Sequence, residues 1–151
     1  MVGKDRLAVR VLLLGPDSRV LLFEGRDLSD ASDAARWWFT TGGKVERGET
    51  LGQAAEREVR EETGQTDLRI VGPFHRREFD FVNHGTPQHQ IEHFFAARTG
   101  SFEVSVEGWT DLERKAVVSW RWWTVPELKA SPGYFYPLNL VELVHQAAAL
   151  A

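Results

Sequence analysis

The chain has 151 residues, of which 42% are hydrophobic and 26% are charged; its net charge is −4 and it contains no cysteine. This length and composition suit one globular domain, expected over residues 1–151. The negative charge argues against extended nucleic acid as a partner, because such binding needs clustered lysine and arginine. The lack of cysteine excludes disulfides, thiol nucleophiles and thiolate metal sites.

No apolar run reaches the roughly 20 residues that a membrane-spanning helix needs. The apolar segment 7–14 is interrupted by Arg10, and no small-residue cleavage site follows it, so it does not read as a signal peptide. We therefore expect a cytoplasmic protein that does not contact a membrane.

Runs of β-branched and aromatic residues predict seven strands. In chain order they cover residues 6–14, 19–23, 37–41, 68–71, 77–82, 90–97 and 117–123. The turn cluster 15–18 joins the first two strands in a hairpin, and the polar segment 28–35 reads as a loop. The third strand is expected to end at Gly42 and Gly43.

Residues 50–63 form the clearest predicted helix. Thr50 and Gln53 match a capping box, and Gly64 is well placed just after the last turn. A short helix is expected over 125–130, behind Pro126, and a closing helix over 138–150. Strands around helices predict an α/β layered domain.

The acidic residues of the first predicted helix carry the functional signal. At about 100° per residue, Glu58, Glu61 and Glu62 fall on the same side as the apolar residues expected to face the core. Carboxylates crowded beside apolar surface must take up protons or bind a cation. Oxygen ligands without sulfur or imidazole favour Mg²⁺ or Mn²⁺.

Two neighbouring features extend this site. Glycine permits close backbone approach, so the carbonyl oxygen of Gly43 can reach the same metal. Arg57 stands eight residues after Glu49 and four before Glu61, and it can pair with either carboxylate and fix its orientation.

The segment 43–65, GKVERGETLGQAAEREVREETGQ, resembles the signature of the Nudix hydrolase family. The positions in register with that signature are Gly43, Glu49, Arg57, Glu58, Val59, Glu61, Glu62 and Gly64. Two positions depart from the family pattern: Gln65 stands where an aliphatic residue is usual, and Thr41 replaces a proline often found before the two glycines.

The resemblance implies a Nudix-type α/β/α sandwich with a mixed β-sheet. It also implies Mg²⁺-dependent hydrolysis of a nucleoside diphosphate linked to another moiety, with water attacking phosphorus. Glu58 and Glu62 would be the principal metal ligands, and Glu61 a further ligand or the base. Arg57 and Glu49 would orient them.

In this family the general base often lies on a later loop. Glu113 is the expected base, on a mobile loop before the Trp-rich strand, and Glu61, Glu92, Glu103 and Glu107 are alternatives. Arg76 and Arg77 could grip a phosphate, although strand alternation exposes at least one of them to solvent. Most of the tryptophans are expected to pack in the core.

The substrate is a nucleotide-like small molecule whose identity depends on loops such as 27–36 and 83–89. A non-catalytic nucleotide-sensing domain is the alternative function, and a homodimer would suit a chain of this kind. Isoprenoid diphosphate isomerisation, which the family also contains, relies on a cysteine that this chain lacks.

Overall fold

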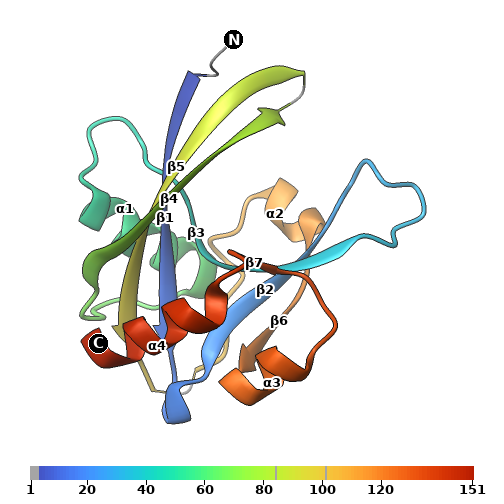
Figure 1. The fold of residues 1–151 in the computed structure, drawn as a ribbon. Helices are drawn as coiled ribbons and strands as arrows, with labels where there is room; N and C mark the ends of the chain where they lie inside the picture. Colours follow the sequence, from blue (N-terminus) through green and yellow to red (C-terminus); the bar gives the residue numbers. More distant parts are fainter. Residues whose placement is uncertain (1–3, 84, 101) are drawn as a thin grey trace.

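One curled β-sheet of seven strands forms the centre of the computed structural model, which describes residues 4–83, 85–100 and 102–151 (Figure 1). The strands are β1 (Lys4–Leu14), β2 (Val20–Arg26), β3 (Arg36–Lys44), β4 (Val71–Asn83), β5 (Thr86–Arg98), β6 (Val117–Trp123) and β7 (Phe135–Tyr136). The helices are α1 (Leu51–Thr63), α2 (Asp111–Ala116), α3 (Val125–Ala130) and α4 (Leu140–Leu150), with a 3₁₀ turn, η1 (Pro16–Ser18), between β1 and β2.

The sheet is mixed. Its strand order is β4-β5-β1-β2-β3-β7, with β6 paired to β2 and an additional pairing of β1 with β3. The β1–β5 and β3–β7 pairs are parallel, and the other pairs are antiparallel. The predicted mixed sheet is therefore confirmed.

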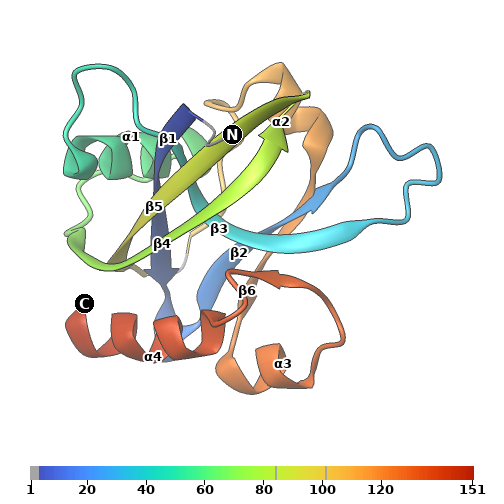
Figure 2. The same cartoon turned by 45° about the horizontal axis from the view of Figure 1, so that its top comes forward.

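Helices cover both faces of this sheet. Figure 2 shows α1 and α4 on opposite sides of β1. Val9, Val11 and Leu13 of β1 belong to the core cluster beneath α1, whereas Leu12 and Leu14 belong to the cluster beneath α4. Because both faces are covered, β1 reads as a nearly continuous apolar run. The predicted α/β/α sandwich is confirmed by this arrangement.

The strand β3 is longer than expected. The predicted end at Gly42 and Gly43 is wrong, because β1 offers these residues a pairing partner: Arg10 lies opposite Gly42 and Val9 opposite Gly43. Gly42 has a φ of +151°, and a Cβ added there would lie 2.1 Å from the carbonyl oxygen of Val9. Only glycine fits this approach of the two strands.

The predicted strand over 68–71 is also wrong, since β4 begins only at Val71. Leu68 and Ile70 lie in the loop before β4 and pack against the core cluster beneath α1. Their apolar character reflects this packing and not strand pairing. No helix in the described ranges is long and apolar enough to cross a bilayer.

Candidate active site

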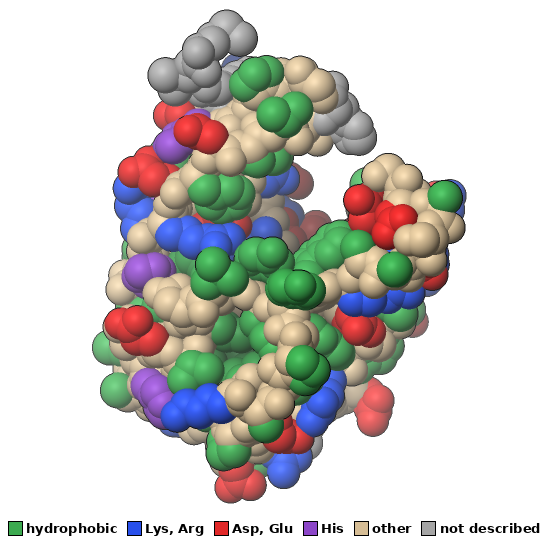
Figure 3. All heavy atoms as spheres, turned by 45° about the vertical axis from the view of Figure 1, so that its right-hand side comes forward, with side chains coloured by type: hydrophobic (Ala, Val, Ile, Leu, Met, Phe, Trp, Pro, Cys, Tyr) green, Lys and Arg blue, Asp and Glu red, His purple; other side chains and the backbone are tan. Residues whose placement is uncertain are grey.

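A cleft of about 1000 Å³ opens beside the segment of β3 that pairs with β1. In Figure 3 the molecule is hollowed between the β4–β5 hairpin and the projecting β2–β3 loop. Aromatic side chains line much of the cleft, among them Phe23, Trp37, Phe39 and Trp109. Its size suits a small organic molecule such as a nucleotide.

The helix α1 brings one of its carboxylates, that of Glu62, to one end of this cleft. Its capping box is present as predicted, with Thr50 accepting from the Gln53 N–H, and Gly64 adopts the left-handed conformation that ends the helix. The inner side of α1 packs on the core through Ala54, Ala55 and Val59. These contacts fix the helix rotation, and with it the direction of the acidic side chains.

Two of the three predicted carboxylates point inward. Glu58 and Glu62 stand one turn apart and are only 8% and 7% exposed. The Glu61 side chain is 42% exposed and lies at the rim, where it shares Nη1 of Arg57 with Glu58. Glu58 and Glu62 are therefore the more buried members of the predicted cluster, and Glu61 is the more exposed one.

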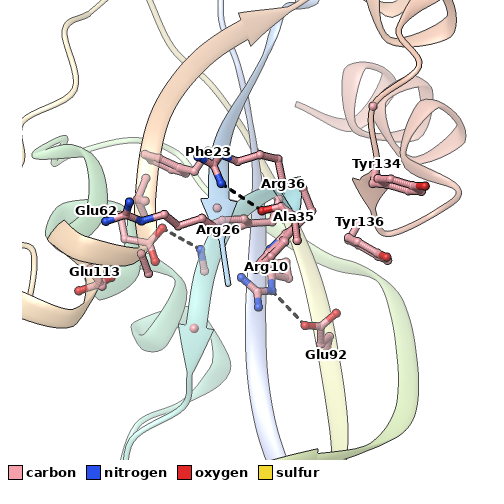
Figure 4. A pocket seen from close by; sticks show the side chains of 18 of the residues that line it. Arg10, Phe23, Arg26, Ala35, Arg36, Glu62, Glu92, Glu113, Tyr134 and Tyr136 are labelled. Atoms are coloured by element: carbon pink, nitrogen blue, oxygen red, sulfur yellow. Dashed lines mark hydrogen bonds and ion pairs between the residues drawn. The ribbon is translucent and has the colours of Figure 1, made fainter. Parts of the chain in front are cut away.

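The inward pair places two buried carboxylates close together, and within the described residues only Glu58 has an ion-pair partner, Arg57. Burial raises the pKa of Glu62 well above its ordinary value, and the nearby charge of Glu58 raises it further. Burial likewise raises the pKa of Glu58. Glu62 accepts the Gly42 N–H at 3.1 Å, which fixes its carboxylate against β3 (Figure 4).

Arg57 pairs with Glu49 and Glu61, as expected, and also with the buried Glu58. Its guanidinium donates to both oxygens of Glu49, at 2.6 and 2.9 Å. It also donates to Glu58 at 2.9 Å, to Glu61 at 3.1 Å and to the carbonyl oxygen of Lys44 at 2.9 Å. Arg57 thus ties α1 to the loop before it and orients Glu58 and Glu61.

The residues present suit a hard divalent cation. A Cβ added to Gly43 would lie only 2.6 Å from Oε1 of Glu58, so the backbone of β3 closely approaches this carboxylate. Within the described residues, no three acidic, histidine or cysteine side chains are grouped to enclose a metal. Mg²⁺ usually takes one or two carboxylates and completes its shell with water and substrate phosphate, which fits a pair such as Glu58 and Glu62.

Glu113 lies on a helix and not on a mobile loop. It belongs to α2, where its carboxylate accepts the Thr110 N–H at 2.9 Å in a second capping box. It lines the same cleft as Glu62, and its charge is among those that raise the pKa of Glu62. The structure therefore brings Glu113 to the carboxylate end of the cleft, on a more rigid element than expected.

The competing acids are placed differently. Glu92 lines the cleft, but it is only 1% exposed and its two oxygens are bonded to Arg10 and Arg77. Burial acts to raise its pKa, yet the two guanidinium groups together hold it below the ordinary value. Glu103 and Glu107 are exposed and are not among the described residues that line the cleft.

The cleft also contains residues to which the sequence assigned no firm role. Arg77 lines it, whereas its neighbour Arg76 is 49% exposed and paired with Glu78. Arg10 lines it as well. The only sequence signal for Arg10 was a charge inside an apolar strand. Alternation along β4 predicted that Arg76 and Arg77 face opposite sides of the sheet, but not which of the two faces the cleft.

The loops expected to set specificity differ in their contribution. The β2–β3 loop places Ala34 and Ala35 in the cleft wall. Residue 84 of the segment 83–89 lies outside the described residues, and the others of that segment do not line the cleft. Tyr134 and Tyr136, near β7, form a wall that the sequence did not indicate (Figure 4).

Comparison with known proteins agrees with this architecture. A family model described as the NUDIX domain matches residues 4–143. Dihydroneopterin triphosphate pyrophosphohydrolase from E. coli is 21% identical with a TM-score of 0.68, and the match covers 100% of both chains. The Ap4A hydrolase of C. elegans is 18% identical with a TM-score of 0.60, with 96% of each chain covered.

A third similar structure is the NUDIX domain of NrtR from Shewanella oneidensis, complexed with ADP ribose. It is 18% identical with a TM-score of 0.65, and the match covers 100% of this chain and 90% of that one. At these identities the structural similarity shows a shared fold.

Proposed function

Because the chain belongs to the Nudix family of hydrolases, as its signature predicted, we propose that it is a Mg²⁺-dependent enzyme that cleaves the diphosphate linkage of a nucleotide-like substrate. The observation that carries this proposal is the buried pair Glu58 and Glu62, of which Glu62 lines a nucleotide-sized cleft and Glu58 stands one helical turn before it. Arg57 pairs with Glu58, but no arginine, lysine or histidine of the described residues pairs with Glu62, and a divalent cation held by both carboxylates would stabilise their charges.

The proposed metal ligands are Glu58 and Glu62, the carbonyl oxygen of Gly43, and Glu61 as a further ligand at the rim. When bound, Mg²⁺ would lower the pKa of a coordinated water and neutralise charge on the phosphate oxygens. Mn²⁺ has similar ligand preferences and is the expected substitute. Arg57 keeps Glu58 and Glu61 oriented through its bonds to both carboxylates.

The proposed reaction is a substitution at phosphorus. The oxygen of a water molecule bonds to phosphorus, the bond to the bridging oxygen breaks, and the leaving phosphate keeps the electron pair. Glu113 accepts the proton from the attacking water. Its place in the cleft, near Glu62, supports this role, whereas the oxygens of Glu92 are already occupied by arginine.

The cleft walls support a substrate with a flat ring. Trp37, Tyr134 and Tyr136 all line the cleft, and aromatic side chains of this kind stack on nucleobases. One domain over residues 1–151, a cytoplasmic location and a homodimer are further proposals, which the sequence motivates.

The function is tested by measuring Mg²⁺-dependent phosphate or nucleotide release from nucleoside triphosphates, nucleoside diphosphate sugars and dinucleoside polyphosphates. Glu62→Gln should lower the metal-saturated rate by about 100-fold or more, since it removes a charged ligand. Glu56→Gln is the matched control, because Glu56 lies on the exposed side of the same helix. Wild-type protein that hydrolyses none of the panel but binds nucleotide would instead be a sensing domain.

The base is tested in the same assay with Glu113→Gln. The amide oxygen of glutamine can still accept the Thr110 N–H, so the capping box survives while the basic carboxylate is lost. We expect kcat to fall at least about tenfold with unchanged Mg²⁺ affinity. Glu107→Gln is the comparison, and a loss confined to that variant would reject Glu113 as the base.

A further inference from the structure

Three arginines form a cluster on the cleft wall built by β1, β5 and β4, and the mechanism above gives them no role. Arg6 and Arg10 lie on β1 and Arg77 on β4, and all three line the cleft. They surround two side chains of β5. Arg10 donates to Glu92 at 3.0 Å and Arg77 donates to it at 2.6 Å, while Arg6 donates to Gln90.

This cluster has a surplus of positive charge. Arg10 and Arg77 share the one carboxylate of Glu92, and Arg6 donates to the neutral side chain of Gln90, which leaves two positive charges uncompensated within the cluster. Glu92 is 1% exposed, and Gln90 donates to it at 2.7 Å, so the carboxylate is fixed in place. The cluster therefore presents fixed positive charge to the cleft and is not a set of mobile surface charges.

The terminal nitrogens of two arginines are available to a ligand. Arg10 and Arg77 both donate a hydrogen bond to Glu92 through Nε. In the described part of the chain, no protein group accepts from either Nη of Arg77 or from Nη2 of Arg10. The Arg77 guanidinium also stacks 4.7 Å above the Phe79 ring, which holds its plane. An oriented guanidinium fork of this kind matches phosphate oxygens.

The cluster begins beside the carboxylate end and extends away from it. Arg10 pairs with Gly42, whose N–H binds Glu62, and in Figure 4 Arg10 lies between Glu62 and Glu92. The strands β3, β1, β5 and β4 lie side by side here. Across these strands Gly42 lies in a row with Arg10, Phe94 and His75. Three strand spacings of about 4.8 Å, with a displacement of two residues of about 3.3 Å each along β4, place the backbone of Arg77 roughly 16 Å from that of Gly42. A ligand that reaches from Glu62 to Arg77 must be longer than one phosphoryl group.

We propose that Arg10 and Arg77 bind a phosphoryl group beyond the diphosphate that is cleaved. The substrate would then carry at least three phosphoryl groups in a row, as nucleoside triphosphates and dinucleoside polyphosphates do. A nucleoside diphosphate sugar would place a neutral sugar at this charged wall. Glu92 and Gln90 are positioning residues for the arginines. This inference rests on the proposed function for the direction in which the substrate lies.

The test is calorimetric binding, with Mg²⁺ present, of two methylene-bridged analogues that resist hydrolysis: a nucleoside triphosphate and the matching nucleoside diphosphate. Wild-type protein should bind the triphosphate analogue more tightly. Arg77→Gln should weaken that binding about tenfold or more and change the diphosphate analogue by about twofold at most. The binding of a methylene-bridged dinucleoside tetraphosphate, measured in the same way, shows whether the third phosphoryl group must be at the end of the phosphate chain.

Arg76→Gln is the matched control, because Arg76 is the adjacent residue of β4 and its side chain is paired with Glu78 instead of lining the cleft. It should leave both affinities within about twofold of wild type. Arg77→Lys keeps the charge without the fork, so its affinity for the triphosphate analogue should fall between wild type and Arg77→Gln. A thermal melt of each variant separates lost binding from lost folding. If Arg77→Gln does not fold, the affinity of Arg77→Lys for the triphosphate analogue tests the inference instead.

Equal affinity of the wild type for both analogues, or an equal loss for both in the Arg77 variants, would overturn the inference. Hydrolysis is measured separately. Discrimination in binding without Mg²⁺-dependent turnover would reject the proposed function and keep the arginine site. Mg²⁺-dependent turnover without this discrimination would keep the proposed function and reject the arginine site.

Discussion

Adding one methyl group at Gly43 provides a direct test of how β3 and α1 fit together. The Cβ of Gly43→Ala would lie 2.6 Å from Oε1 of Glu58 and 2.9 Å from its Cδ, whereas ordinary contacts begin at 3.4 Å. The difference, 3.4 minus 2.6, means that Glu58 must move by about 0.8 Å. Its bond to Nη1 of Arg57, now 2.9 Å, would then be strained or broken.

We expect this substitution to reduce activity more than stability. A displacement of about 1 Å at a reacting centre can lower a rate by roughly 100-fold. Overpacking of this kind costs about 1–3 kcal/mol, and the lower part of that range is expected because a side chain and not the backbone has to move. The assays are the Mg²⁺ dependence of kcat and urea unfolding.

Gly52→Ala is the control from the same region. Gly52 lies in the first turn of α1, and an added Cβ there has no atom within 4 Å. Replacing a helical glycine by alanine should stabilise the protein by about 0.5–1 kcal/mol and leave turnover unchanged. Wild-type kcat and Mg²⁺ dependence in Gly43→Ala would refute the idea that Glu58 must occupy this position.

Two further predictions concern ionisable groups away from α1. Glu92→Gln leaves Arg10 and Arg77 without their carboxylate, so urea unfolding should show a loss of about 2–3 kcal/mol at neutral pH, discounted for the 20% and 28% exposure of these arginines. Because the arginines hold the folded pKa of Glu92 below its ordinary value, its contribution is present above about pH 4.3 and is lost as pH falls through the folded pKa. A wild-type advantage that is the same at pH 3 as at pH 7 would contradict this. In an NMR titration, His89 should titrate at higher pH than His93, since hydrogen bonds to Glu78 and Asp80 raise the pKa of His89 and burial lowers that of His93; coincident midpoints would show that the Glu78–His89–Asp80 contacts do not form in solution.

Features encoded in contiguous residues could be read from the sequence. The capping box of Thr50 and Gln53, the left-handed Gly64 and the pairing of Arg57 with Glu49 and Glu61 all occur as expected. They depend on the geometry of one helix and the loop before it, which is nearly the same in any fold. The family signature lies in the same stretch, and the resemblance that it carries also predicted the fold.

The exposure of each side chain on that helix could not be predicted from the sequence. Glu61 meets Glu58 at the Arg57 guanidinium, but its side chain is more exposed than those of Glu58 and Glu62. Helical periodicity places a residue to within a broad arc. The position of β3 and the partners available at the rim then decide which carboxylates are buried.

Contacts between distant strands could be determined only by the tertiary structure. Arg10 and Glu92 are 82 residues apart, and they meet because β1 pairs with β5 in a particular register. Moving the register by one residue would turn every side chain of a strand to the other face. Alternation alone therefore left Arg76 and Arg77 equivalent, and the pairing of Arg77 with Glu92 across β4 and β5 placed Arg77 in the cleft.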